Sequence, residues 1–140
     1  MRATVEQAHP SRARSELRLP AQPSELARAR RYAHEAAAAF GLDEERCYEV
    51  VFAVNEAVTN AIRHGRPDEQ GCIELSACSD GERLTLIVCD HGTFVPPAAV
   101  EGGPSCEGGR GFPLMAGLMD TVELHTLPGC TTVCLSKVRM

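Results

Sequence analysis

The sequence predicts an α+β fold of two layers, in which helices cover one face of a mixed, mostly antiparallel sheet. The stretch VFAVNEAVTNAIRHG, residues 51–65, repeats apolar residues at three- and four-residue steps, which is the period of a helix with one buried stripe. Residues 72–79 and 82–89 instead alternate apolar and polar side chains, and Asp80-Gly81 joins them as a dipeptide typical of tight hairpins. The full order of strand, two helices, hairpin, loop, helix and hairpin favours helices layered on a sheet.

Size and charge narrow the classes of function. A chain of 140 residues is long enough for one domain with its own core. The formal net charge of −5 argues against nucleic acid as the main partner, because a nucleic-acid surface needs clustered Lys and Arg to neutralise phosphates. No stretch is long and apolar enough to cross a bilayer, and the first residues lack the apolar segment of a secretory signal. We therefore expect no membrane partner and a cytoplasmic protein.

The N-terminal residues are expected to contribute little to the core. Residues 1–14 are polar and lack periodicity, which predicts a disordered tail followed by a single domain over residues 15–140. Residues 15–21 alternate briefly and predict a short edge strand, which Pro20 and Pro23 close.

The first helix is expected to begin after Ser24, as its N-cap, and to run to Phe40, with Gly41 as its stop. Arg28 and Arg31 lie one turn apart on this helix. Two interpretations of these arginines are open. They form either a cationic surface for an acidic protein partner or an ordinary solvated helix face.

The second helix is expected to begin after Asp43, as its cap, and to end at Gly65. Glu56, Asn60 and His64 fall four residues apart and form a polar column along one side of it. A Glu can accept a proton or orient a water, and the carbonyl oxygen of Asn is a hard ligand suited to Mg²⁺. Taken alone, a Glu and an Asn in such a column are more typical of the solvated face of an amphipathic helix.

After the hairpin, residues 93–109 are rich in Pro and Gly, and loops of that length in a compact domain tend to be functional or mobile. Residues 110–119 return to helical spacing, and residues 121–127 and 131–138 predict two strands around the turn Pro128-Gly129.

Three elements carry polar groups that suit one ligand. The helix of Glu56 and Asn60 comes first, Asp90-x-Gly92 then closes a buried strand, and Gly109-x-Gly111 opens a helix. Free backbone amides at a helix N-terminus form an anion site, because the helix dipole adds to them. Each motif is weak alone, but a metal ligand, an anion cradle and a base together indicate a nucleoside triphosphate.

This ordered set resembles the nucleotide-binding boxes of the ATPase fold shared by gyrase, bacterial sensor histidine kinases and the anti-sigma factor serine kinases. The chain is most similar to the anti-sigma group, whose helix reads much like NEAVTNAIRHG, and the likeness extends from Ser15 to the C-terminus. A sensor histidine kinase is the poorer match, because no helical hairpin supports a phosphoacceptor role for His34.

The resemblance implies a role for each matching residue. Glu56 would be the base that activates the attacking hydroxyl, and Asn60 would coordinate Mg²⁺ on the phosphates of ATP. Asp90 would accept a hydrogen bond from the adenine amino group. The remaining nucleotide contacts would come from Gly92 beside the base, from Gly109, Arg110 and Gly111 around the phosphates, and from Thr131 or Thr132 at the adenine end. Residues 93–109 would form a lid.

The resemblance also implies a function. It describes an ATP-dependent anti-sigma factor that binds a sigma factor and phosphorylates an anti-anti-sigma antagonist of the STAS type on Ser or Thr. Relatives act as homodimers, and Arg28 aligns with an arginine that contacts the partner. The alternative is a nucleotide-binding regulatory module that sequesters a protein partner without phosphotransfer. The presence of Glu56 favours the kinase.

Overall fold

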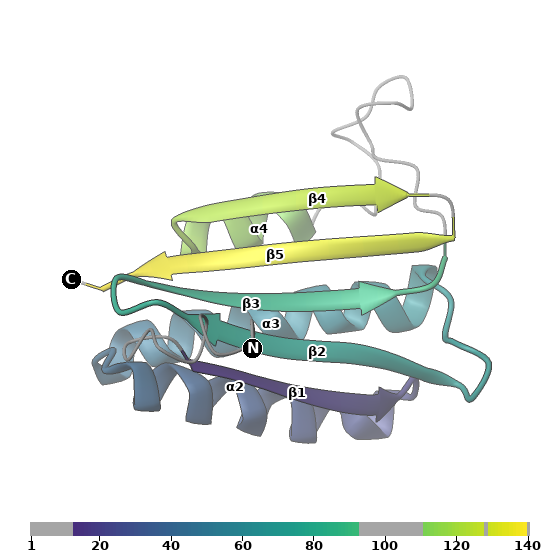
Figure 1. The fold of residues 1–140 in the computed structure, drawn as a ribbon, viewed down its shortest axis with the longest axis horizontal. Coiled ribbons are helices and arrows are strands. Elements are labelled where there is room, and N and C mark those ends of the chain that lie inside the picture. Colours follow the sequence, from purple (N-terminus) through teal and green to yellow (C-terminus); the bar gives the residue numbers. More distant parts are fainter. Residues whose placement is uncertain (1–12, 93–110, 128, 140) are drawn as a thin grey trace, which may run out of the picture.

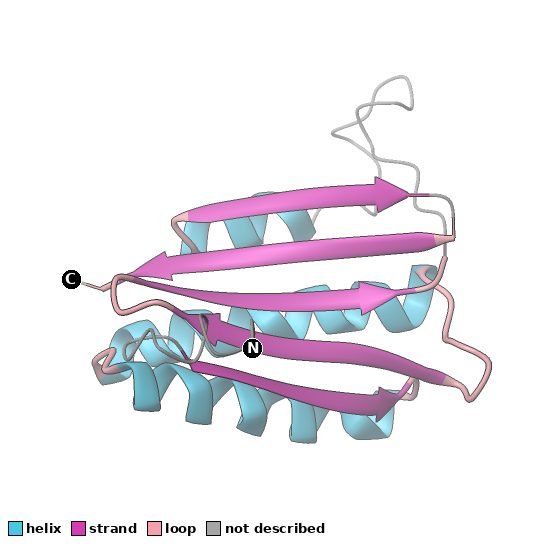
Figure 2. Cartoon of the chain, viewed as in Figure 1, coloured by secondary structure: helices cyan, strands magenta, loops and turns pink. Residues whose placement is uncertain are grey.

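A sheet and a layer of helices make up the computed structural model, which describes residues 13–92, 111–127 and 129–139. The helices all lie behind the sheet in the view of Figure 1, and Figure 2 shows the same two layers by type of element. In chain order the elements are β1 (Ala13–Pro20), the 3₁₀ turn η1 (Pro23–Glu25), α2 (Leu26–Phe40), α3 (Glu44–His64), β2 (Cys72–Ser79), β3 (Arg83–Asp90), α4 (Gly111–Leu118), β4 (Thr121–Leu127) and β5 (Cys130–Val138).

The strand order is β1-β2-β3-β5-β4, and every pairing between the described strands is antiparallel. The predicted α+β class is confirmed, and β1 lies at an edge as expected, but the sheet predicted to be mixed is antiparallel throughout its described strands. The last strand, β5, inserts between β3 and β4, so the end of β3 lies beside the start of β5. This neighbourhood places Asp90 directly opposite Thr131.

The predicted helix ends are partly confirmed. Gly41 ends α2 in the left-handed conformation, with φ 105°, and Asp43 caps α3 by accepting a hydrogen bond from the Arg46 amide at 2.9 Å. The prediction that Ser24 caps α2 is wrong. Ser24 lies inside the 3₁₀ turn that begins at Pro23, and its hydroxyl donates to the Gln22 side chain at 3.4 Å. Helix α2 has Glu25 at its N-cap position, with no side-chain hydrogen bond to its first amides.

The core lies between the two layers. Ile73, Leu75 and Ala77 of β2 alternate into it as predicted, and β3 does the same with Leu84, Leu86 and Val88. On the facing side α2 presents the small residues Ala29, Ala33 and Ala37, all fully buried. Small side chains let this helix approach the sheet closely, which suits a core with few aromatic residues.

The start of the first strand differs from the expectation. Strand β1 begins at Ala13, inside the segment expected to be disordered, because Ala13 and Arg14 pair with Ser79 and Cys78 of β2. The expected tail up to residue 12, the lid over residues 93–109, and with it Gly109 and Arg110 lie outside the described residues. No helix in the described part of the chain has the length and apolar character needed to span a membrane.

Candidate functional site

A pocket opens where α3, α4 and the sheet meet. Three of the side chains predicted for the site, Asn60, Asp90 and Thr131, line it together. Its empty volume, including the part open to solvent, is about 480 Å³. The other lining residues are mainly apolar or small: Ala57, Ala61, His64, Gly65, Val88, Met115, Leu124 and Val133. Apolar walls with a few polar groups are typical of a site for a flat, partly polar ligand.

Helix α3 supplies the polar edge of the pocket. Its stripe of Val54, Val58 and Ala61 is buried against the sheet, which turns Asn60 toward the flank that borders the pocket. Glu56, one turn earlier, is half-buried on the same flank but does not line the pocket itself. Within the described residues, neither the Glu56 carboxylate nor the Asn60 carboxamide has a hydrogen-bond partner. Both groups are therefore available to a ligand.

Asp90 is the buried carboxylate of the site, with 6% of its surface exposed. One of its oxygens, Oδ1, accepts hydrogen bonds from the amides of Gly92 at 2.7 Å and Arg66 at 3.4 Å. Burial raises the pKa of the Asp90 carboxyl, and these two hydrogen bonds oppose part of that effect. The backbone thus holds Asp90 as a preorganised acceptor at the end of β3.

Gly65 belongs to the site, although its place in the sequence predicted only the end of a helix. A Cβ at this position would lie 2.5 Å from Oδ2 of Asp90, so no side chain fits there without displacing the carboxylate. The residues around Gly65 do not predict this contact, because Asp90 lies 25 positions further along the sequence.

Gly92 holds Asp90 and Thr131 in place. Its amide donates to Asp90, and its carbonyl accepts from Oγ1 of Thr131 at 2.9 Å. A Cβ on Gly92 would come within 3.0 Å of the Arg66 amide nitrogen, so the small residue lets the two loops approach. Gly92 was predicted to sit beside the base, and it does not itself line the pocket.

The two candidate threonines point to opposite faces of β5. Thr131 lies on the helix side, lines the pocket and is buried. Thr132, the next residue, pairs with Cys89 and lies in a groove on the outer face of the sheet. Alternation along a strand therefore excludes Thr132 from the pocket, contrary to its inclusion among the predicted site residues.

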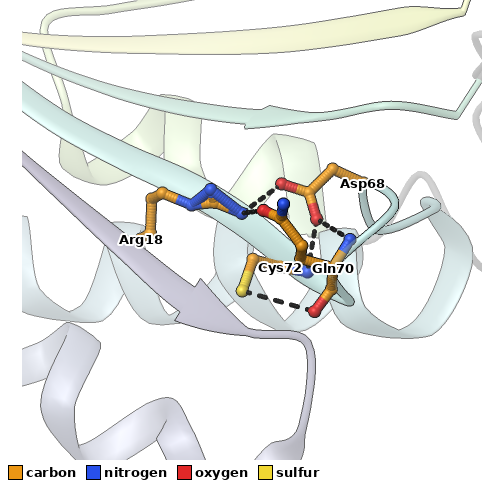
Figure 3. A network of polar contacts seen from close by, with 4 residues as sticks. All are labelled: Arg18, Asp68, Gln70 and Cys72. Carbon is orange, nitrogen blue, oxygen red and sulfur yellow. Dashed lines mark hydrogen bonds and ion pairs between the residues drawn. The ribbon is translucent and has the colours of Figure 1, made fainter.

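A polar network stabilises the loop of residues 66–71, which carries the Arg66 amide. Figure 3 shows Arg18 of β1 donating to the Asp68 carboxylate at 2.5 Å and to the Gln70 side chain at 2.9 Å. The other oxygen of Asp68 accepts from the amides of Gln70 at 2.8 Å and Cys72 at 2.9 Å. The hydrogen bond from Cys72 is the main reason that the pKa of Asp68 lies below its usual value, and the nearby Arg18 contributes to it. The Arg66 carbonyl of this loop also accepts a hydrogen bond from the His91 amide at 2.7 Å.

The remaining predicted site residues lie apart from the pocket. Gly111 is the first residue of α4, the helix that sends Met115 into the pocket wall. Arg28 and Arg31 are exposed on α2, and Arg28 forms an ion pair with Glu25 at 3.3 Å. They form no part of the pocket.

The residues present fit an adenine nucleotide with a divalent cation. Asp90 offers a fixed acceptor for an exocyclic amine, and the apolar walls suit the faces of a purine. Asn60 offers one amide oxygen, and Mg²⁺ commonly completes its shell with phosphate oxygens and water. In residues 13–92, 111–127 and 129–139, no three His, Cys, Asp or Glu side chains gather to hold a metal.

Comparisons with known proteins agree with this geometry. Residues 19–137 match the family described as histidine kinase-like ATPase domain. The serine-protein kinase RsbW of Bacillus pumilus (strain SAFR-032) is 32% identical over 136 residues, covering 87% of this chain and 83% of its own. The anti-sigma F factor of Thermoanaerobacter sp. (strain X514) is 32% identical over 96 residues, or 64% of this chain and 67% of its own.

A solved structure of the RsbU and RsbW domains of a Mycobacterium tuberculosis protein superposes with a TM-score of 0.64 at 20% identity. The superposition covers 90% of this chain and 32% of that longer chain, so it supports the fold of the one domain.

Proposed function

The chain belongs to the histidine kinase-like ATPase domain family, and we propose that it is an ATP-dependent anti-sigma factor with serine/threonine-protein kinase activity. It binds a sigma factor, and it phosphorylates an anti-anti-sigma antagonist of the STAS type on Ser or Thr. The observation that carries this proposal is the pocket in which Asn60, Asp90 and Thr131 meet beside the half-buried carboxylate of Glu56. Relatives named serine-protein kinase and anti-sigma F factor, both 32% identical to the chain, support it.

The base of the nucleotide is recognised at the end of β3. Asp90 accepts a hydrogen bond from the amino group of adenine, while Oδ1 stays bonded to the Gly92 and Arg66 amides. Val88 and Met115 line the pocket and would pack on the faces of the ring. Guanine presents a carbonyl where adenine has its amine, and a carbonyl facing a carboxylate leaves two acceptors unpaired.

The phosphates would extend from the base toward α3 and the start of α4. Asn60 would hold Mg²⁺ with its amide oxygen, and the metal would neutralise charge on the triphosphate. Gly109, Arg110 and Gly111 are proposed to receive the phosphates with amides at the N-terminus of α4. Glu56 takes the proton from the serine or threonine hydroxyl of the antagonist as that oxygen attacks the γ-phosphate.

The protein partners are proposed to meet the exposed face of α2. Arg28 and Arg31 are solvent-exposed there, and an acidic side chain of a partner would bind the Arg31 guanidinium directly and would compete with Glu25 for that of Arg28. We propose a homodimer as the working form, and the cytoplasm, where sigma factors act, as its location. No direct contact with nucleic acid is part of the proposal, in keeping with the net charge of −5.

Transfer of labelled phosphate tests the proposal. The purified protein is incubated with γ-labelled ATP, Mg²⁺ and candidate STAS-type antagonists from the same genome, and the label is expected on one Ser or Thr of one antagonist. ATP binding without transfer to any antagonist would instead support the alternative, a regulatory module that sequesters its partner without phosphotransfer. Absence of ATP binding would contradict both.

A further inference from the structure

A lysine is buried at the end of the molecule away from Asp90. Lys137 of β5 has only 5% of its surface exposed, on the face that also buries Val133 and Leu135. Removing an ammonium group from water is costly unless it is paired and hydrogen-bonded. Its Nζ donates to Oε1 of Glu49 at 2.6 Å and to the carbonyl of Leu118.

The three groups belong to three different elements. Lys137 lies on β5, Glu49 on α3, and Leu118 is the last residue of α4. Carbonyls in the last turn of a helix lack donors within the helix and lie at the negative end of its dipole. The last turn of α4 contains no basic residue of its own. Lys137 therefore supplies, from the neighbouring strand, the cation that the end of α4 lacks.

The chain that leaves α4 is tied to the same strand. The amide of Asp120 donates to the Ser136 carbonyl at 2.9 Å, and the Asp120 carboxylate accepts from the Val138 amide at 2.7 Å. These bonds flank Lys137 on both sides. The C-terminal end of α4 is thus held by main-chain and charged contacts, in addition to its apolar packing.

The elements joined at Lys137 also build the pocket. Asn60 comes from α3, Met115 from α4 and Thr131 from β5. Met115 is three residues before Leu118, and its carbonyl accepts from the Met119 amide at 2.9 Å. Figure 1 shows α4 lying behind β4 and β5, so a shift of its C-terminal end would move both Met115 and the start of the helix at Gly111.

We infer that Lys137 is a positioning residue for the nucleotide site. Its partly buried ion pair with Glu49 and its bond to Leu118 set the position of α4 against α3 and β5. This inference rests on the proposed function, because the position of α4 matters to a nucleotide whose base contacts Met115 and whose phosphates meet the helix start.

The test compares Lys137→Met with a matched control. Methionine keeps much of the apolar length of the side chain but removes the charge and the donors. The control is Arg46→Met: Arg46 of α3 donates to the Val138 carbonyl of β5 at 3.2 Å, so it joins two of the same elements, and among the described residues its side chain has no hydrogen bond to α4. Hydrogen exchange of the α4 amides, with the Met119 amide as reporter, is measured without nucleotide. Lys137→Met is expected to speed this exchange at least about tenfold relative to Arg46→Met.

The affinity for nucleotides is the second readout, and it is measured at a temperature well below the unfolding temperature of each variant. Lys137→Met is expected to lower the affinity for ATP at least about tenfold and the affinity for AMP less, because the start of α4 would contact the distal phosphates, which AMP lacks. Equal exchange in the two variants, or a lower unfolding temperature with unchanged ATP affinity, would overturn the inference and leave Lys137 merely structural. Should Lys137→Met fail to fold, Glu49→Gln removes the same ion pair under the same comparison. A wild-type protein that binds no ATP would contradict the proposed function, while the exchange data would still decide whether Lys137 holds α4.

Discussion

The Asp90 carboxylate lies against Gly65 so closely that a Cβ on that glycine would come within 2.5 Å of Oδ2. The same Cβ would lie 2.7 Å from the carbonyl of Ala61, so the backbone of α3 confines the position from the other side. Asp90 cannot easily retreat, because its Oδ1 is held by the Gly92 amide at 2.7 Å. The C-terminal end of α3 therefore helps to fix the position of the buried Asp90 carboxylate.

Substituting Gly65 tests this contact. Gly65→Ala is expected to destabilise the fold by about 1–3 kcal/mol, because the new methyl group overlaps fixed atoms. It is also expected to weaken adenine nucleotides at least about tenfold by displacing Asp90. Chemical denaturation and calorimetric titration measure the two effects. Gly117→Ala in α4 is the control, since nothing lies within 4 Å of a Cβ there, and it should leave affinity unchanged while adding up to about 1 kcal/mol of stability. Matching behaviour of the two variants would remove Gly65 from the site.

Asp90→Asn is expected to separate stability from binding. Burial raises the pKa of Asp90 in the folded protein. A raised folded pKa means that the carboxyl favours folding most below its unfolded pKa of about 3.9, and that this contribution is lost as the pH rises through the folded value. At neutral pH the buried charge therefore opposes folding. Without nucleotide, the Asp90→Asn variant should be at least as stable to unfolding as the wild type at pH 7. As the pH falls, the free energy of unfolding of the wild type should rise relative to that of the variant. Urea denaturation across the acid range measures it.

The same variant should bind adenine nucleotides poorly. An amide can present its NH₂ group to the adenine amine, which leaves two donors facing each other in a buried pocket, and a loss of about 10- to 100-fold is expected. Calorimetry with ATP and GTP measures the change. Equal affinity of the wild-type protein for the two nucleotides would rule out Asp90 as the group that selects the base.

Asn60→Ala is expected to abolish Mg²⁺-dependent ATP binding without loss of the fold. The side chain lines the pocket and has no hydrogen-bond partner among the described residues, so its removal costs no internal bond. Asn55→Ala is a matched control on the same helix, because Asn55 bonds to Arg30 at 3.0 Å and does not line the pocket. Titration of ATP with and without Mg²⁺ gives the answer. Unchanged ATP affinity of Asn60→Ala would exclude the metal-ligand role.

Glu56→Gln is expected to retain nucleotide binding but to lose phosphate transfer. Glutamine preserves size and most hydrogen bonding, yet it cannot accept a proton, so single-turnover transfer to the antagonist should fall by about 10²-fold or more. The variant should still bind its sigma partner and act as an inhibitor that the antagonist releases without being modified. Glu35→Gln, at an exposed carboxylate on α2, serves as the control. Transfer within a few-fold of wild type would eliminate Glu56 as the base.

Features that depend on neighbours in the sequence were open to prediction from the sequence alone. The apolar period of residues 51–65 predicted α3 and put Asn60 on its polar flank, and Asp80-Gly81 predicted the β2–β3 hairpin. Helical period and turn conformation arise from contacts within a few residues, so they are written in local patterns. The motif at Asp90 was visible for the same reason, because it directly follows a buried alternating strand.

Only the tertiary structure decided which residues far apart in the chain come into contact. The register of β5 against β3 placed Thr131 in the pocket and turned Thr132 to the outer face, a choice that two adjacent threonines cannot reveal. The approach of Gly65 to Asp90, and the burial of Lys137 against Glu49, likewise arise when separate elements pack. A side-chain period of two makes the face of a strand depend on its partner's register, and a buried charge depends on which group lies opposite it. Those conditions are met only once the layers are assembled.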